Sequence, residues 1–267
     1  MAKLSDDAQP YLSFKDLKEF LEAKVEQYQK PEFLSSDPIQ IPHGFEQKED
    51  IEISGFLTAT IAWGNRKSII QNAKSMMERM DNSPHEFVLH ANNAEYSGLE
   101  GFVHRTFNGS DLVFFVRALG VIYREYGGLE ALFTPKIPVG NLNGSISNAR
   151  QLFLGIPHQE RSEKHFSNPG KGSAAKRIHM FLRWMVRTAE TGIDFGLWKD
   201  IKPAQLSCPL DIHSGTVARK LGLLSRKQND ARAVLELDLA LRRMDPMDPV
   251  KYDFALFGLG VFERFGQ

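Results

Sequence analysis

The chain has 267 residues, which corresponds to one large domain or two closely associated ones. Its 42% hydrophobic and 25% charged residues are typical of a globular protein and exclude a collagen, a coiled coil or a wholly disordered chain. The 33 basic and 33 acidic residues cancel, which argues against a uniformly basic protein that coats nucleic acid. The single cysteine, Cys208, excludes an internal disulfide and a cysteine-only zinc or iron–sulfur site.

The apolar stretches of the chain bear on its localisation. The amino-terminal residues lack the apolar core of about 7–15 residues that a signal peptide contains. No apolar stretch approaches the length of about 18 residues that a membrane span requires. Together with the single cysteine, which suits a reducing compartment, these features predict a cytoplasmic protein with no membrane partner.

The net charge of zero conceals two oppositely charged segments. Residues 1–60 contain six lysines and twelve acidic residues, a balance of −6, whereas residues 161–227 contain thirteen basic and five acidic residues, a balance of +8. A basic segment can attract a polyanion such as nucleic acid, because binding releases the counterions of the phosphates. The alternative is an ordinary solvated surface with scattered lysine and arginine side chains.

Helical periodicity runs through the whole chain and predicts an all-α fold of roughly ten helices, because apolar residues recur at steps of three and four. The predicted helices lie at residues 14–29, 49–63, 68–80, from 84 onward, 111–126, 129–133, 143–153, 173–188, 212–221, 231–244 and 249–265. Pro38 and Pro42 predict an extended loop after the first helix, and the composition of 155–172 predicts another loop. We therefore expect two parts: residues 1–48, a helix and loop packed on the core, and the helical region 49–267.

Two segments of this series contain candidate functional residues. Gly170 and Gly172 directly precede a helix, where a glycine hairpin lets backbone N–H groups approach a phosphate; a plain turn is the alternative. Asp211 follows Pro209 and Leu210 and directly precedes the predicted helix at 212–221. At this place a carboxylate is either a helix cap or a functional group. The two segments in this order are more specific than either one alone.

This order resembles the helix-hairpin-helix DNA glycosylases of base-excision repair, which have a Leu-Pro-Gly-Val-Gly hairpin, a helix, and then Val-Asp-Thr-His. Here the hairpin is Asn168-Pro169-Gly170-Lys171-Gly172, and the aspartate motif is Leu210-Asp211-Ile212-His213. Residues 54–80, 123–132 and 257–260 resemble the family's early helix pair, its tyrosine-glycine segment and its closing glycine turn. The Asp37–His43 loop and the Ala62–Arg66 bend more closely resemble a bacterial family of unknown function.

The resemblance implies a two-lobed bundle of many helices, with the helix-hairpin-helix at about 166–188 and the aspartate helix at about 211–222. It implies a monomer that binds double-stranded DNA with a damaged or flipped base, and no cofactor. Asp211 would stabilise the positive charge that develops on the sugar when the base leaves. Lys176 would be the amine nucleophile of an enzyme that is also an abasic-site lyase. In an alignment without gaps, the residue at the position of the family's lysine nucleophile is Ala174, so a monofunctional hydrolase is an alternative.

The resemblance also implies which residues contact DNA. Lys171, Arg177, Arg219 and Lys220 would meet phosphates, with the hairpin glycines beside them. On the bend after the second helix, Trp63, Asn65 or Arg66 would fill the gap left by the flipped base. The side chains that would line a base pocket are Trp184, Trp198 and His213, with core packing as the alternative for the tryptophans.

The remaining patterns favour no other chemistry. The eight histidines include no pair at metal-ligand spacing, so no metal site is expected. No nucleophile elbow and no Walker motif occurs. The sequence therefore predicts a DNA glycosylase, with or without lyase activity, for a base such as oxidised guanine. The alternatives are a non-catalytic helix-hairpin-helix module that binds nucleic acid, and a helical scaffold.

Overall fold

The computed structural model describes residues 12–137 and 140–265, and within them the fold is all-α as expected. A single two-stranded hairpin accompanies twelve α-helices in these residues, its strands being β1 (Val103–His104) and β2 (Phe107–Asn108). The helices are α1 (Phe14–Tyr28), α2 (Lys48–Thr60), α3 (Arg66–Glu78), α4 (Pro84–His90), α5 (Asn93–Leu99), α6 (Gly109–Glu125), α7 (Gly128–Phe133), α8 (Asn143–Leu154), α9 (Lys176–Val186), α10 (Ile212–Lys220), α11 (Ala231–Met244) and α12 (Tyr252–Val261).

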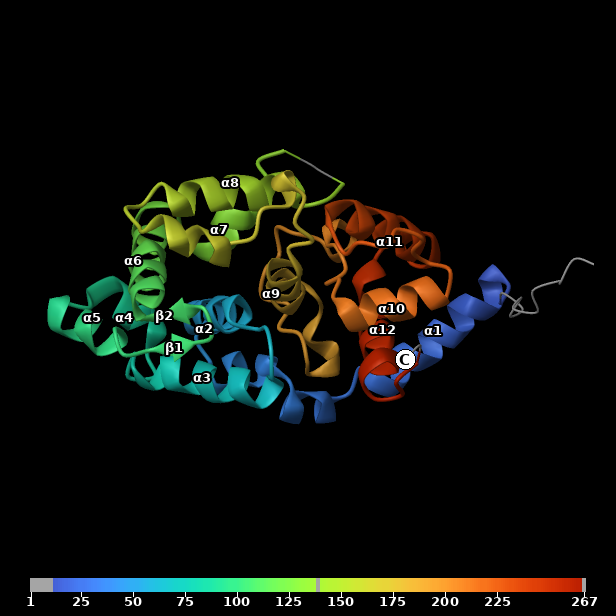
Figure 1. Cartoon of the computed structure of the whole chain (residues 1–267), viewed down its shortest axis with the longest axis horizontal. Coiled ribbons are helices and arrows are strands. Elements are labelled where there is room, and N and C mark those ends of the chain that lie inside the picture. Colours follow the sequence, from blue (N-terminus) through green and yellow to red (C-terminus); the bar gives the residue numbers. More distant parts are fainter. Residues whose placement is uncertain (1–11, 138–139, 266–267) are drawn as a thin grey trace, which may run out of the picture.

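The helices form two lobes, and α9 stands between them (Figure 1). The first lobe contains α2 to α8. Its hydrophobic cluster extends from Ile39 to Leu206, includes the buried face of α9, and is joined by Val250 and Phe254. A second hydrophobic cluster joins α1 to Cys208, Leu210 and the helices α10, α11 and α12. The all-α, two-lobed arrangement thus follows from two separate sets of apolar side chains.

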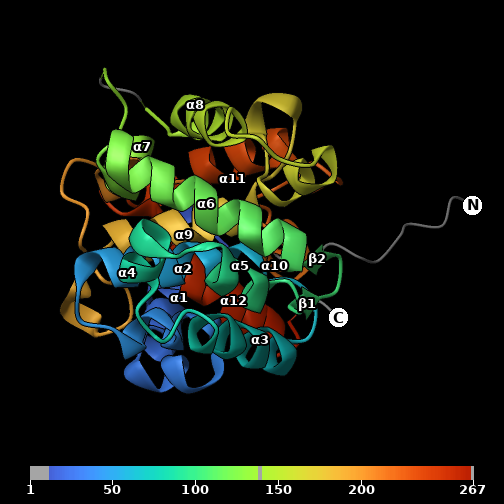
Figure 2. The ribbon, with the colours of Figure 1, turned by 90° about the vertical axis from the view of Figure 1, so that its left-hand side faces the viewer.

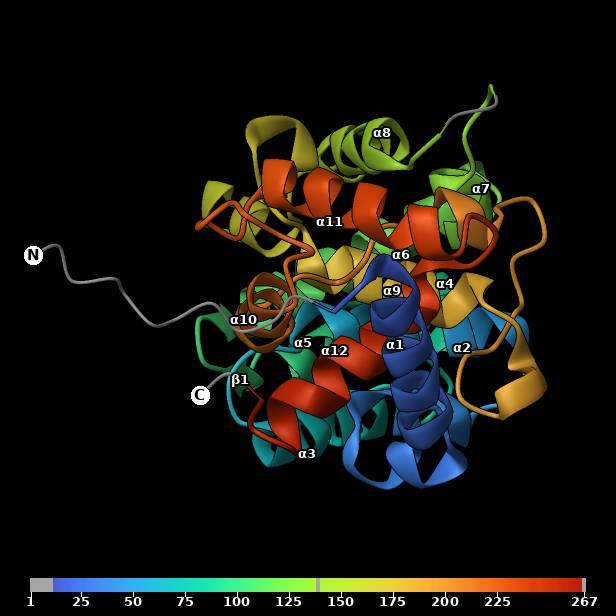
Figure 3. The same cartoon turned by 90° about the vertical axis from the view of Figure 1, so that its right-hand side faces the viewer.

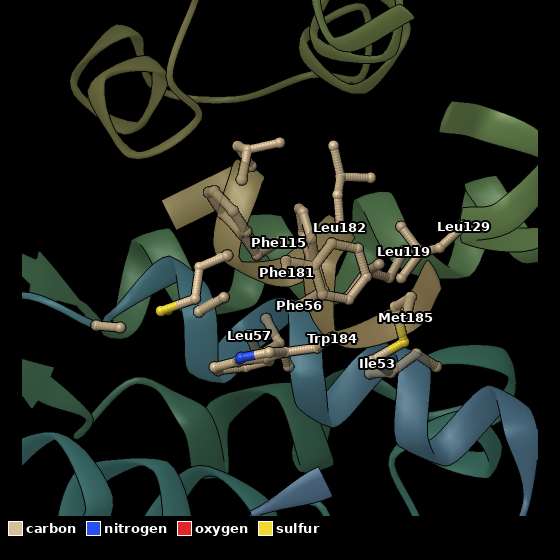
Figure 4. Packing of buried hydrophobic residues seen from close by; sticks show 14 of the residues in the cluster. Ile53, Phe56, Leu57, Phe115, Leu119, Leu129, Phe181, Leu182, Trp184 and Met185 are labelled. Carbon is tan, nitrogen blue, oxygen red and sulfur yellow. The ribbon is translucent and has the colours of Figure 1, made fainter. Parts of the chain in front are cut away.

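The first core is centred on α2 and α9, which lie against each other (Figure 4). Ten consecutive residues of α2, from Ile51 to Thr60, are buried, because neighbouring elements cover this helix on every side. The ring of Phe56 meets the ring of Phe181 edge to face, with centroids 5.4 Å apart. Trp184 lies in this core and has no exposed surface, so it does not line a base pocket as predicted. Trp198 is also buried, and its indole N–H donates to Glu52 at 2.6 Å.

The amino-terminal helix belongs to the second lobe. Figure 3 shows α1 lying across α12, and Leu17, Leu21 and Val25 enter the second cluster. The helices touch at Gly258, where a Cβ atom would stand 2.1 Å from the ring of Tyr28. The residues predicted as a closing glycine turn therefore lie inside α12, where glycine permits this close approach. The lobes also divide the chain differently from the expected boundary at residue 48, because α1 and the loop that follows it join different clusters.

The predicted loops are more regular than expected. The loop after α1 forms three 3₁₀ helices, at Pro31–Ser36, Pro38–Gln40 and Pro42–Gly44, each with a proline at its first position. Proline suits that position because its fixed φ angle matches a helical turn and its missing N–H is not needed there. The loop at 155–172 contains two further 3₁₀ helices, Glu160–His165 and Pro169–Lys171.

The face turned toward the viewer in Figure 2 is crossed by α6 and contains two elements that the sequence did not predict. These are α5 and the β1–β2 hairpin, which stand between α4 and α6 in the chain. Leu99 is the only buried residue of α5, so this helix has no apolar stripe from which it could have been predicted. In the described part of the chain, no helix is long and apolar enough to span a membrane.

Candidate functional site

A pocket of about 670 Å³ opens where the two lobes meet beside α9. One wall comes from the first lobe, through the bend at 62–66 and the 3₁₀ turn that begins at Pro38. The opposite wall comes from the start of α10 and from α12 in the second lobe. Lys176, Met180 and Arg183 line it from α9, because residues at steps of three and four share one face of a helix.

Lys176 and Asp211 meet in this pocket. Lys176 is the first residue of α9, and Asp211 caps the amino end of α10, where its Oδ1 accepts the N–H of Ser214 at 3.0 Å. The other oxygen, Oδ2, lies 3.7 Å from Lys176 Nζ. The side chains of Lys176 and Asp211 are 30% and 25% exposed, respectively, so both can be reached from solvent. Asp211 is therefore a helix cap with one oxygen and the partner of a lysine with the other.

A second charged group lies deeper in the same pocket and was not predicted from the sequence. Asp253 is 6% exposed, and its Oδ2 accepts a hydrogen bond from Arg183 Nη1 at 2.5 Å. Burial raises the pKa of the Asp253 carboxyl to about 6, and the nearby charge of Asp211 also raises it. Arg183 Nε faces Asp194 at 3.3 Å, and the guanidinium lies 4.4 Å from the ring centroid of Phe254.

Asp37 completes the deeper part of the pocket. Its Oδ1 accepts the N–H of Ile39 at 3.0 Å, which fixes the side chain at the start of a 3₁₀ turn. The residue is 8% exposed. Burial raises the pKa of its carboxyl, and the positive charges of Arg183 and Arg66 oppose that rise. No periodicity could have placed Asp37 in the same pocket as Asp253, because they come from opposite ends of the chain.

Aromatic rings and two arginines form the rest of the wall. Trp63, predicted as a residue of the wedge, lines the pocket, and the guanidinium of Arg177 lies 4.8 Å from its ring centroid. Arg177 also donates to the carbonyl of Thr60, and burial lowers the pKa of its guanidinium to about 10. Arg66 lies 4.9 Å from the ring centroid of Phe257. Arg66 and Arg177, predicted to contact DNA, therefore face the interior of the pocket.

Asn65, the remaining residue of the predicted wedge, is exposed and caps α3. Its Oδ1 accepts the N–H of Ser68 at 3.1 Å. The preceding Gly64 has a φ angle of +97°, a conformation that side-chain-bearing residues rarely adopt. This glycine turns the chain sharply at the bend, between the pocket wall and the first residue of α3.

The glycine hairpin lies outside the pocket. The carbonyl of Gly172 accepts the N–H of Ala231 at 3.0 Å, which ties the hairpin to the start of α11. Inside the hairpin, the N–H of Lys171 donates to Asn168 and the N–H of Gly172 donates to Pro169. Gly170, Lys171 and Gly172 are exposed. The Lys171 side chain, rather than these two amides, is the group that a phosphate would meet.

The residues predicted around α10 divide into rim residues and internal ones. His213 is exposed at the rim of the pocket, and Lys220 is exposed at the last turn of α10. Arg219 instead donates to the carbonyl of Arg226 at 2.8 Å and to Asn229 at 2.6 Å. This arginine, predicted to contact a phosphate, holds the loop that follows α10 with two of its nitrogen atoms.

Most arginines of the basic segment are paired with other groups of the protein. Arg161 pairs with Asp111 at 2.6 Å, and Arg187 pairs with Asp194 at 2.6 Å. Arg226 pairs with Asp230. The exposed cations of this segment include Lys164, Lys171, Lys220 and Lys227. The balance of +8 along residues 161–227 therefore overstates the basic surface, because many of its charges have partners. Among the described residues, no group of three or more His, Cys, Asp or Glu side chains is arranged to hold a metal ion.

Comparisons with known proteins identify this chain at the level of a family. Neither the curated proteins nor the solved structures contain a match to it. A family model described as "Protein of unknown function (DUF2400)" matches residues 37–262, a span that includes Asp37, Lys176, Asp211 and Asp253. Because this match covers most of the 267 residues, the chain belongs to the DUF2400 family.

Proposed function

We propose that the protein is a DNA glycosylase with abasic-site lyase activity, in which Lys176 is the nucleophile and Asp211 assists it. The observation that carries this proposal is the distance of 3.7 Å between Lys176 Nζ and Asp211 Oδ2 inside an open pocket. The resemblance of residues 168–172 and 210–213 to the helix-hairpin-helix glycosylases supports it. An amine beside a carboxylate is the arrangement that such covalent chemistry requires.

The reaction would begin with transfer of a proton from the Lys176 ammonium to the carboxylate of Asp211. The free amine then attacks C1′ of the deoxyribose, and the bond between C1′ and the base breaks. The bonding electron pair leaves with the base, which takes the proton that Asp211 accepted from Lys176. Opening of the sugar ring gives an iminium between Lys176 and the sugar. Once its proton has passed to the base, Asp211 is again a carboxylate and stabilises the positive charge of the iminium.

The pocket suits a base that has left the DNA stack. Its volume of about 670 Å³ falls in the range of about 300–1,000 Å³ of small-molecule sites. The rings of Trp63, Phe254 and Phe257 line it, and a flipped base stacks favourably between aromatic side chains. Exposed Lys171 and Lys220 would contact phosphates around the flipped nucleotide.

Borohydride trapping tests this function. The purified protein would be mixed with duplex DNA that contains an abasic site or 8-oxoguanine, and sodium borohydride would reduce the iminium to a stable crosslink. We expect a crosslinked species with the wild type and none with Lys176→Gln. Lys15→Gln is the matched control, because it removes an exposed lysine on α1, away from the pocket and the hairpin, and should still be trapped. Equal trapping of Lys176→Gln and the wild type would contradict the proposal.

The same experiment distinguishes the second candidate, a non-catalytic module that binds nucleic acid through the hairpin. The exposed Lys171 on the hairpin favours this alternative, because it lies outside the pocket. Such a module would bind duplex DNA with an affinity that falls as salt increases, and would give no crosslink. Lys171→Gln would then weaken binding, whereas Lys176→Gln would leave it unchanged.

A further inference from the structure

Two carboxyl groups in the pocket have no part in the chemistry of Lys176 and Asp211. Asp37 reaches the pocket from a 3₁₀ turn of the first lobe, and Asp253 reaches it from α12 of the second. Both are more than nine-tenths buried, whereas Lys176 and Asp211 are about a quarter or more exposed. The charge of Arg183 acts on both buried carboxyls, so they share one electrostatic environment.

The hydrogen bonds of these two carboxyls leave acceptor capacity unused. Asp37 Oδ1 holds the N–H of Ile39, and no residue in the described ranges 12–137 and 140–265 bonds to its other oxygen. Asp253 Oδ2 is bonded to Arg183, while Oδ1 meets the weak donor Cys208 Sγ at 3.9 Å. A carboxylate offers about four acceptor sites, and unsatisfied acceptors in a buried place are costly. A ligand that fills the pocket is favoured if it brings N–H donors.

Arg183 uses part of its donor set within the protein. Its Nη1 is bonded to Asp253, its Nε faces Asp194 at 3.3 Å, and its flat face lies on Phe254. A base that enters between the aromatic rings and reaches Asp37 would meet a carboxylate acceptor at its edge. This condition separates the four bases by the pattern of donors and acceptors along the edge they present.

A flipped base is read along its Watson–Crick edge. Guanine presents two adjacent donors there, N1–H and the 2-amino group, which match the two oxygens of one carboxylate. Adenine and cytosine each place a ring-nitrogen acceptor beside their amino donor, and thymine flanks its N–H with two carbonyl oxygens. Adenine, cytosine and thymine would each place an acceptor atom against a carboxylate oxygen. The two atoms would repel each other, and the buried oxygen would have no donor.

We infer that Asp37, supported by Asp253, makes the pocket selective for a guanine-derived base through its N1–H and 2-amino donors. This inference rests on the proposed function of the pocket as a base site. Asp37 and Asp253 are then specificity-determining residues, distinct from the pair that performs the chemistry. The aromatic walls accept any planar base, so the selectivity comes from the carboxyls.

The test compares two free bases that differ only in the 2-amino group, 8-oxoguanine and 8-oxohypoxanthine. Calorimetry at pH 8, above the pKa of about 6 for Asp253, should give about tenfold tighter binding of 8-oxoguanine to the wild type. Asp37→Asn keeps an oxygen for the N–H of Ile39 but turns an amide N–H₂ toward the donors of the base. We expect this variant to lose the preference while keeping the melting temperature of the wild type.

Asp50→Asn is the matched control, because Asp50 also accepts a backbone N–H, from His85 at 2.8 Å, and lies outside the pocket. It should keep the preference. Equal binding of the two bases by the wild type, no binding of either, or an unchanged preference in Asp37→Asn would overturn the inference. If Asp37→Asn unfolds, the comparison of the two bases on the wild type decides alone.

A parallel arm separates this inference from the proposed function. Duplexes that contain 8-oxoguanine or 8-oxohypoxanthine opposite cytosine would be trapped with borohydride. Selective binding of free 8-oxoguanine without trapping of either duplex would support the selectivity and contradict the glycosylase function. Trapping of both duplexes at equal rates, together with equal binding of the two free bases, would support the function and overturn the selectivity.

Discussion

The two ends of α9 contain the same kinds of charged partners in contrasting arrangements. At the amino end, Lys176 faces Asp211 across 3.7 Å, and both side chains are partly exposed. At the carboxyl end, Arg187 is 2% exposed and pairs with Asp194 at 2.6 Å and with Asp248 at 2.8 Å. The short, buried ion pairs of Arg187 are held in one geometry by several hydrogen bonds. The longer, solvent-exposed pair of Lys176 and Asp211 can exchange partners and protons.

The buried end also explains how the open end is positioned. Asp194 follows α9 on the side of the first lobe, and Asp248 precedes α12 in the second. Arg187 therefore joins the two lobes that form the pocket walls, and it also reaches Gln29, the residue after α1, at 3.4 Å. Charged residues whose hydrogen-bonding groups are nearly all paired therefore stabilise the structure. Loosely paired charged residues are candidates for chemistry.

The largest effect should come from breaking the open pair. We expect Asp211→Asn to lower the rate of borohydride trapping about 10³-fold, because an amide cannot take a proton from Lys176 or balance the charge on the sugar. The free energy of unfolding should hardly change, since asparagine is as good a helix cap as aspartate. Asp211→Ala should lose the cap as well, and cost about 1 kcal/mol in urea unfolding. Wild-type trapping by Asp211→Asn would contradict the proposed role.

Breaking the buried pair should have the opposite signature. Arg187→Met keeps the length of the side chain but leaves Asp248 without its arginine and removes one of the partners of the buried Asp194. We expect the free energy of unfolding to fall by about 3–5 kcal/mol, because an uncompensated charge remains in the interior. Below its melting transition the variant should still be trapped through Lys176. A loss below about 1 kcal/mol in urea unfolding would show that this network does not stabilise the junction of the lobes.

This contrast between the ends of α9 could be predicted only in part from the sequence. The apolar spacing placed most helices within a few residues, and α11 matches its predicted bounds of 231–244. The order of the hairpin and aspartate motifs brought Lys176 and Asp211 forward as candidates, and the structure places them in one pocket. Both results depend on short-range patterns, which periodicity and motif spacing record.

The rest depends on which distant residues meet, and no local pattern contains that information. A count of charges cannot distinguish Arg219, bonded to its own loop, from the exposed Lys220 beside it. Asp37 and Asp253 come together only because the two lobes close around α9. The burial of Trp184 could have been predicted, because the residue lies within a helix rich in apolar residues. That position favours the core over a base pocket.

The smallest effect concerns a titratable residue of α9 that has no carboxylate partner among the described residues. His179 is 2% exposed, and burial lowers its pKa from the usual 6.5 to about 4. The unfolded chain therefore takes up a proton as the pH falls below about 6.5, whereas the folded protein does not do so until about pH 4. Acid favours the unfolded state in this window, by about 3 kcal/mol at its lower end.

Other buried groups overlap with this window, so the measurement must isolate His179. Burial also lowers the pKa of His165 to about 4, which destabilises the fold in acid in the same direction. Asp253 acts oppositely: its raised pKa of about 6 lets the folded protein take up a proton before the unfolded chain does, and this stabilises the fold as the pH falls.

Urea unfolding of the wild type and of His179→Leu at pH 7 and pH 4.5 isolates His179, because the contributions of the other groups are the same in both proteins and cancel in the difference. We expect the stability of the variant to depend less on pH, by about 2.5 kcal/mol over the interval. Identical pH dependence of the two proteins would mean that the folded protein accommodates the charge on His179. A buried charge without a carboxylate partner would then be no more costly than the charges of the paired arginines of the same helix.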